Sequence, residues 1–188
     1  HKTIGNSSDY IGIEDINPTN DDGFILTGII RRPSPRHNPI VMKLNACGEM
    51  EWCNVYNTPN NWQEWGQSIQ SVPGGYIALM LVYGPDSVNQ RICLYRLDDE
   101  GELLWRQWYA QSDSSIFDPM GETMIVTEDY HYIINGFCYY PNPGTSWPKY
   151  LRPIIIKVDS TGLLDWETPW DFVNGEEFLG QSWLSIMD

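Results

Sequence analysis

The residues of this chain best suited to contact a ligand are aromatic side chains outside its repeated part. They are Trp62, Trp65, Tyr140, Trp147 and Tyr150. Two segments carry them, 57–65 between two repeat units and 139–150 within a third. Aromatic rings on connecting segments stack on sugars or anchor protein partners. The alternative is that both segments only cover the edges of neighbouring units, so both interpretations stay open.

No arrangement of residues predicts catalysis or metal binding. His1, His37 and His131 lie in unrelated parts of the sequence, and no serine or cysteine nucleophile recurs beside them. Segment 17–23 is as acidic as a calcium loop, but Ile29 stands where such a loop needs a carboxylate, so we interpret it as a turn. Carboxylate pairs for glycoside hydrolysis are present in number only. We predict no catalytic residue, no metal ligand and no cofactor.

One motif of nine residues occurs three times, at 44–52, 97–105 and 158–166. Each copy begins with an aliphatic residue, has glycine at its centre and ends with tryptophan, and the copies are 53 and 61 residues apart. The repeated positions are Gly48, Trp52, Gly101, Trp105, Gly162 and Trp166. Glycine suits a hairpin turn. A tryptophan that returns at one position is expected to pack between units.

Three further columns recur around this motif. A basic residue precedes each copy, an aromatic residue followed by isoleucine opens an earlier strand, and a Gly-x-Ser/Thr sequence opens a unit. These columns are Lys43, Arg96 and Lys157; Phe24, Tyr76 and Tyr132; and Gly66, Gly121 and Gly180. Internal repetition of this kind predicts an array of small units.

The segments between the predicted turns are short and apolar, which predicts an all-β fold. Four strands per unit, joined by hairpins, are what a β-propeller blade requires, and each blade needs neighbours to bury its faces. We predict one propeller domain with blades at 11–57, 66–110 and 121–169 and the first strand of a fourth at 180–187. Residues 1–10 would be a lead-in or the tail of a preceding unit.

Three blades and one strand are too few for a closed ring, because propellers have about four to eight blades. We therefore expect the chain to be a fragment of a longer array, and its first residues, His1-Lys2-Thr3, are unlike a translation start. The alternative is that copies of the chain assemble to complete the ring.

The charge and hydropathy of the chain exclude two classes of partner. The formal net charge of −14 argues against nucleic acids and anionic membranes, because both need a basic face. The longest apolar run, at 76–83, is far too short to cross a membrane. We therefore expect neither nucleic-acid binding nor direct membrane insertion.

The cysteines give a weak indication of the compartment. Cys47 and Cys53 flank a predicted turn, and we predict a disulfide between them, which would imply an oxidising, extracytoplasmic location. Two separate thiols are the alternative, and no nearby histidine or second cysteine pair suggests zinc. Cys93 and Cys138 fall in apolar columns and are expected to be small core residues.

The units resemble the propeller-like repeats of secreted and surface proteins from Bacteroidetes-type bacteria. The resemblance rests on 66–69 (Gly-x-Ser-Ile), on 74–77 (Gly-Gly-Tyr-Ile) and on 94–98 with Gly101 and Trp105. It implies export by type IX secretion to the cell surface or outer membrane, although the sorting domain of such proteins does not lie within these residues. The resemblance covers most of the chain and is specific for fold rather than for function.

The hairpin motif is also similar to the tryptophan motif of pyrroloquinoline-quinone-type propellers and, more distantly, to Kelch-like propellers. The match is best at 159–166. Quinone dehydrogenases of that group need a calcium-bound quinone and adjacent cysteines stacked on it. This chain has no adjacent cysteines, which argues against quinone chemistry.

Taken together, these features predict a non-catalytic, extracytoplasmic binding or scaffold module. Its partner would be a protein at the bacterial cell surface, and a glycan is a second kind of ligand. A propeller-based enzyme is the alternative, with a hydrolase favoured over a quinone-dependent oxidoreductase. A purely structural part of a surface assembly is the third possibility.

Overall fold

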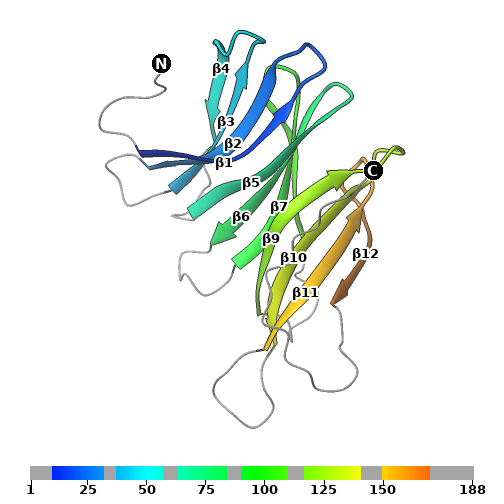
Figure 1. Ribbon diagram of the computed structural model, residues 1–188. Helices are drawn as coiled ribbons and strands as arrows, with labels where there is room; N and C mark the ends of the chain where they lie inside the picture. The colour runs from blue at the N-terminus through cyan, green and yellow to red at the C-terminus, as the bar shows by residue number, and fades with distance from the viewer. Residues whose placement is uncertain are drawn as a thin grey trace.

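The computed structural model shows three four-stranded antiparallel sheets (Figure 1). It describes residues 10–31, 37–56, 63–83, 90–109, 117–140 and 150–169. No helix occurs within these ranges, so none of them forms the long apolar helix that a membrane span requires. The all-β prediction is confirmed. The predicted lead-in before residue 10 and the predicted strand at 180–187 lie outside the described residues.

Each sheet is a meander, in which every strand pairs with the strands before and after it. The first sheet contains β1 (Tyr10–Pro18), β2 (Phe24–Arg31), β3 (His37–Leu44) and β4 (Met50–Val55). The second contains β5 (Gln63–Val72), β6 (Gly75–Tyr83), β7 (Gln90–Leu97) and β8 (Leu103–Tyr109). The third contains β9 (Phe117–Val126), β10 (Tyr132–Tyr140), β11 (Tyr150–Val158) and β12 (Leu164–Pro169). The second and third sheets thus begin at Gln63 and Phe117, somewhat before the predicted starts at 66 and 121.

Because every strand reverses direction, the connections divide between two ends of the sheets. Short turns lie at one end, which we call the turn end: 19–23, 45–49, 73–74, 98–102, 127–131 and 159–163. The other end, which we call the connection end, borders 32–36, 57–62, 84–89, 110–116 and 141–149.

The three motif turns share one local design. Gly48, Gly101 and Gly162 have φ values of 71°, 80° and 90°, which is the left-handed conformation that glycine adopts most easily. Three residues before each glycine, an Asn or Asp side chain accepts two backbone N–H groups; at Asp98, these belong to Glu100 and Glu102, at 3.1 and 2.7 Å. The predicted role of the glycine as a turn residue is confirmed.

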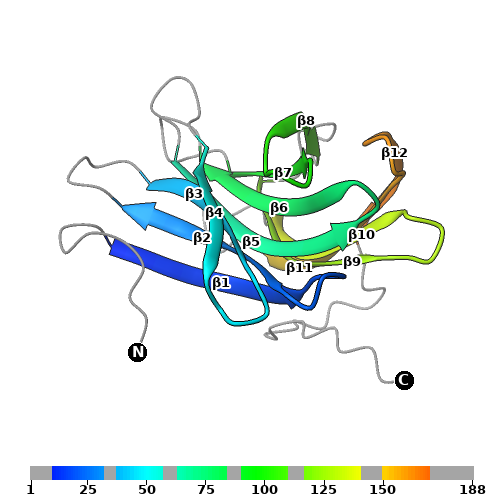
Figure 2. The ribbon, with the colours of Figure 1, turned by 90° about the horizontal axis from the view of Figure 1, so that it is seen from above.

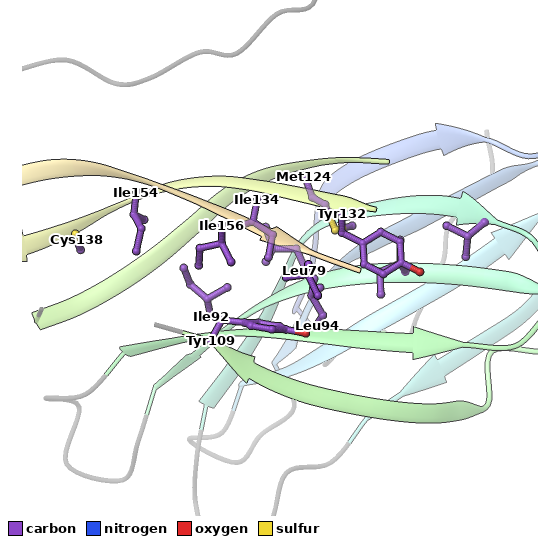
Figure 3. Close-up of a cluster of buried hydrophobic side chains, with 13 residues drawn as sticks. Leu79, Ile92, Leu94, Tyr109, Met124, Tyr132, Ile134, Cys138, Ile154 and Ile156 are labelled. Carbon is purple, nitrogen blue, oxygen red and sulfur yellow. The ribbon is translucent and has the colours of Figure 1, made fainter. Parts of the chain in front are cut away.

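Two buried clusters lie between the sheets, and a smaller cluster of Leu26, Ile30, Ile40 and Met42 belongs to the first sheet alone. The first strands follow one another in space, since β5 lies against β1 and β9 lies against β5 (Figures 1 and 2). Buried side chains from facing sheets then form continuous clusters. Figure 3 shows the cluster between the second and third sheets, which includes Leu79, Ile92, Leu94, Tyr109, Met124, Tyr132, Ile134, Cys138, Ile154 and Ile156.

The repeated tryptophan closes each junction by packing on the turn glycine of the next sheet. A Cβ atom added to Gly101 would lie 2.6 Å from the ring of Trp52, and the Nε1 of Trp52 donates to the carbonyl of Asp99 at 3.1 Å. The hydroxyl of Tyr56 donates to the carbonyl of Gly101 at 2.6 Å. The first junction is therefore held by both ring packing and hydrogen bonds, and the predicted packing role of Trp52 is confirmed.

The second junction repeats this contact. A Cβ atom added to Gly162 would lie 3.0 Å from the ring of Trp105, and the hydroxyl of Tyr109 donates to the carbonyl of Gly162 at 2.8 Å. Trp166, the third member of the column, is 45% exposed.

The predicted disulfide is wrong, because no disulfide joins Cys47 to Cys53. Cys47 lies exposed in the turn, whereas Cys53 lies inside β4, opposite Met42, and packs against the core cluster of the first sheet. Three extended residues, or about 10 Å, separate Cys53 from the start of the strand, so flanking a turn in sequence does not bring the two thiols together. Cys93 and Cys138 are fully buried, which confirms them as core residues.

Candidate functional site

The structure describes the side chain of one of the five predicted ligand-contacting residues. Trp62 and Trp147 lie outside the described residues. Tyr140 and Tyr150 end β10 and begin β11, where their backbones pair directly, but their side chains are not among those described. Trp65 is described in full.

Trp65 lies in a strand and not in a connecting segment, which corrects the sequence-based assignment. It is the third residue of β5, and its backbone pairs with Leu81 of β6. The sequence analysis placed Trp65 in the segment 57–65 between two repeat units, but pairing with β6 begins at Gln63. The indole is therefore held by a rigid sheet at its connection end.

Trp65 forms an aromatic cluster with His37 and Tyr83, which we call the connection-end cluster. The ring centroids of Trp65 and Tyr83 are 4.5 Å apart at an interplanar angle of 70°, and those of His37 and Trp65 are 5.1 Å apart at 63°. Both are edge-to-face contacts, which aromatic pairs prefer. His37 comes from β3 of the first sheet, and the other two come from the second sheet, so the cluster bridges two sheets.

The cluster is distinct from the hydrophobic core. Its three side chains are partly exposed, and none belongs to the buried clusters between the sheets. Rings held in place but still open to solvent are the kind of surface that binds a partner. The cluster is therefore the candidate site.

The electrostatics of the cluster keep it neutral near pH 7. Burial, and then the nearby charge of Arg31, lower the pKa of His37 below its ordinary value of 6.5. Burial, and then the charge of Asp118, raise the pKa of Tyr83. Asp118 has a φ of 49°, a strained conformation for a residue with a side chain, and such strain is concentrated at functional sites.

His37 and Tyr83 were missed by the sequence analysis, which gave neither residue a binding role. His37 is in fact the first residue of β3 and pairs with Arg31. One signal could have indicated Tyr83: it stands seven residues after Tyr76, as Tyr139 stands seven after Tyr132.

A second polar region, at the turn end, serves the fold. A cleft of about 320 Å³ lies between the first two sheets. At its centre, the nearly buried Lys43 donates to Asp21 at 2.7 Å and to Glu51 at 2.9 Å, so its charge is already paired. Burial alone would lower the pKa of Lys43, but these two hydrogen bonds outweigh burial and the net shift is upward.

The other members of the basic column make equivalent ties. Arg96 donates to the carbonyls of Pro73 and Gly74, at 2.6 and 3.1 Å, and so fixes the turn between β5 and β6. Lys157 lies 3.7 Å from Asp165 of β12. The basic residue that recurs before each motif thus holds neighbouring segments together at the turn end. Because the charge of Lys43 is used in this way, we do not regard the cleft around it as a ligand site.

Replacing Asp21 by Asn is expected to change the dependence of stability on acid. The hydrogen bond from Lys43 holds the pKa of Asp21 well below its ordinary value of 3.8. A lowered carboxyl pKa adds stability that is present above about pH 4 and is lost as the pH falls further. Because Asp21 is more than half exposed, we expect the variant to lose under about 1 kcal/mol at pH 7.

The measurement is urea unfolding of both proteins between pH 7 and pH 2. The difference in unfolding free energy between them should shrink below pH 4. A constant difference over the whole range would contradict the paired-carboxylate interpretation. Asp22→Asn, at an exposed neighbouring position in the same turn, serves as the control.

Titratable groups elsewhere do not assemble into a metal site within the ranges that the structure describes. His131 lies between Asp129 and Asp165, with nitrogen–oxygen distances of 3.1 and 3.3 Å. This group ties the turn between β9 and β10 to β12, across the intervening strand β11. It resembles the Lys43 contact in its role.

No family model matches the chain, and no curated protein matches it. The function must therefore be inferred from the geometry of the described residues.

Proposed function

We propose that this chain is a segment of a β-propeller that acts as a non-catalytic binding module, with the connection-end cluster as its contact surface. Three meander sheets whose first strands lie next to one another support the propeller assignment. The repeated tryptophan-on-glycine contact supports it further, because it joins consecutive sheets in the same way. An extracytoplasmic location is supported by the resemblance of the repeats alone, since Cys47 and Cys53 are not bridged.

The observation that carries the binding proposal is the bridging of two sheets by Trp65, Tyr83 and His37. The rings stand at the end of the sheets from which the longer connections leave, whereas the turn end is closed by short turns and paired charges. Binding residues concentrate where connections meet a rigid scaffold. The connection-end cluster stands on rigid strands and lies beside the connections.

The chemistry of the cluster favours a protein partner with basic side chains. The faces of indole and phenol rings attract Lys and Arg cations. The net charge of −14 would steer a basic partner toward the chain. A sugar would stack on the same rings without depending on charge, so a glycan is the second candidate.

Trp65→Ala is expected to weaken binding of a Lys/Arg-rich peptide selected from a peptide library by about tenfold or more, because a central tryptophan commonly dominates an interface. Affinity is measured by isothermal titration at pH 7.5 and at low and high salt. Tyr130→Ala is the control, because Tyr130 is 48% exposed in a turn at the opposite end. Equal affinity of both variants would refute the assignment.

Repeating the binding measurement at several pH values distinguishes a basic peptide from a glycan as the ligand. Protonation of His37 below its lowered pKa puts a positive charge into the cluster. A basic peptide should then bind more weakly as the pH falls through the lowered pKa of His37, whereas a neutral glycan from an array should bind equally well. His37→Gln should remove this dependence on pH.

A further inference from the structure

The connection-end cluster has a carboxylate neighbour in the third sheet. Asp118 is the second residue of β9, and β9 packs against β5, β6 and β7 of the second sheet (Figure 1). Burial, then the charge of Asp118 and then that of Tyr139, raise the pKa of Tyr83. A negative charge from the third sheet therefore acts on an aromatic cluster that bridges the first two.

The backbone of β9 departs from a regular strand at Asp118. Asp118 and Pro119 stand opposite the single residue Cys138 of β10, because the register of the two strands shifts between Phe137 and Tyr139. An extra residue of this kind forms a β-bulge, which re-aims a side chain and is frequent next to active sites. Asp118 also has a φ of 49°, which residues with a Cβ atom rarely adopt. Both features give the Asp118 carboxylate a direction that a regular strand would not.

Gln90 adds a hydrogen-bond acceptor at the same end of the sheets. It is the first residue of β7, and its backbone pairs with that of Tyr83. A side-chain hydrogen bond also links the two residues. In the part of the chain that the structure describes, Oε1 of Gln90 is buried and has no hydrogen-bond partner. A buried acceptor without a donor is unfavourable, so a ligand that brings a donor removes this cost. The side chain of Gln90 is partly exposed, which lets a ligand reach its amide group.

These groups together match the side chain of arginine better than that of lysine. A guanidinium group is planar, stacks on aromatic rings, and carries five N–H donors that can form two parallel bonds with a carboxylate. The ammonium group of lysine is a compact charge without this fork. Asp118 already makes contacts of its own, but its two carboxylate oxygens offer about four acceptor positions.

We propose that the connection-end cluster, together with Asp118 and Gln90, binds one arginine side chain of a partner protein. The guanidinium lies against the rings of Trp65 and Tyr83. It donates to the carboxylate of Asp118 and to Oε1 of Gln90. This inference rests on the proposed function, because it takes the cluster as a binding surface. It adds which side chain of the partner is recognised and which two residues distinguish that side chain.

The probes are three capped tripeptides, Gly-X-Gly, in which X is arginine, lysine or citrulline. Citrulline has the shape of arginine without its charge. Each probe is titrated into the 188-residue chain at low salt, to millimolar concentrations, and the NMR signal of the Trp65 indole N–H is followed. Trp65→Phe identifies that signal among those of the nine tryptophans. We expect a saturable shift with the arginine peptide and affinities about tenfold lower for the other two.

Two variants test the residues that would distinguish arginine. Asp118→Asn removes the charge and keeps the backbone, because asparagine tolerates the left-handed conformation. It should lower the affinity for the arginine peptide about tenfold and abolish the preference over citrulline. Gln90→Met removes the amide at similar length and should lower the same affinity by about threefold or more.

Glu128→Gln is the matched control. It makes the same change of charge in the third sheet, but in an exposed turn at the opposite end. Its affinity for the arginine peptide should equal that of the unmodified chain. Circular dichroism on each variant establishes that it is folded.

The outcomes separate this inference from the proposed function. Equal affinity for the arginine and lysine peptides, or an unchanged affinity in Asp118→Asn, would overturn the arginine assignment. The absence of a Trp65 shift with all three peptides would overturn it as well. In each case the proposed function stands if Trp65→Ala still weakens binding of the library-selected peptide. It fails too if Trp65→Ala leaves that binding unchanged.

Discussion

Gly101→Ala is expected to lower the free energy of unfolding by about 3 kcal/mol. Two costs combine. A residue with a Cβ in the left-handed conformation costs roughly 1–2 kcal/mol, and Gly101 has a φ of 80°. The new Cβ would also lie 2.6 Å from the ring of Trp52, and overpacking of this kind costs about 1–3 kcal/mol.

Gly48→Ala separates the two costs. Gly48 has the same conformation but nothing within 4 Å of its Cβ, so the expected loss is only about 1 kcal/mol. Unfolding in urea measures the difference, and equal losses would show that Trp52 does not press on Gly101.

Tyr95→Phe is expected to cost about 2–3 kcal/mol, the second large effect. The hydroxyl of Tyr95 donates to Oε2 of Glu64 at 2.6 Å, and the two residues are 1% and 0% exposed. Burial, and then the charge of Glu64, raise the pKa of Tyr95 strongly, so the phenol keeps its proton. Hydrogen bonds to buried charged groups contribute about 1.5–3 kcal/mol. The ring contact with Tyr56 is retained in the variant.

Tyr132→Phe is the control for this prediction. Tyr132 is 2% exposed, but its hydroxyl reaches the carbonyl of Ser160 only at 3.5 Å, a weak bond whose loss should cost less than about 1 kcal/mol. A double-mutant cycle with Glu64→Gln then measures the coupling between Tyr95 and Glu64. A coupling energy near zero would contradict the charged hydrogen bond.

The turns could be predicted from sequence because their chemistry is local. An Asn or Asp followed three residues later by glycine specifies both the capping oxygen and the left-handed residue, as at Asp98 and Gly101. Trp52 could be assigned to packing because it recurs. The pairing of Cys47 with Cys53 could not be judged in this way, since sequence distance does not say which way a strand side chain points.

The recurrence of the glycine column at the start of each unit is explained only by how the sheets pack. Gly66 recurs because a Cβ there would lie 1.8 Å from Oγ1 of Thr27 in the sheet before it. At Gly121, the close neighbour would be the side chain of Leu79, at 3.0 Å. The column marks the closest approach of first strands to the preceding sheet.

The candidate site was predictable only in part. Trp65 was singled out as an aromatic residue outside the repeat, but its partners His37 and Tyr83 come from other strands and, for His37, from another sheet. Which strand ends meet across two sheets depends on how the sheets stack, and a local sequence pattern does not encode that stacking.

The separation of the two ends of the sheets also bears on how such a chain can diversify. Strand register is anchored at the turn end, and at the connection end Tyr83 and Gln90 pair directly across the segment 84–89. A longer segment between two such anchored residues costs little, about 0.6 kcal/mol for each doubling of its length. The chain is therefore a frame into which new sequence can be inserted at one end while the other end preserves the architecture. Specificity can evolve there with little loss of stability.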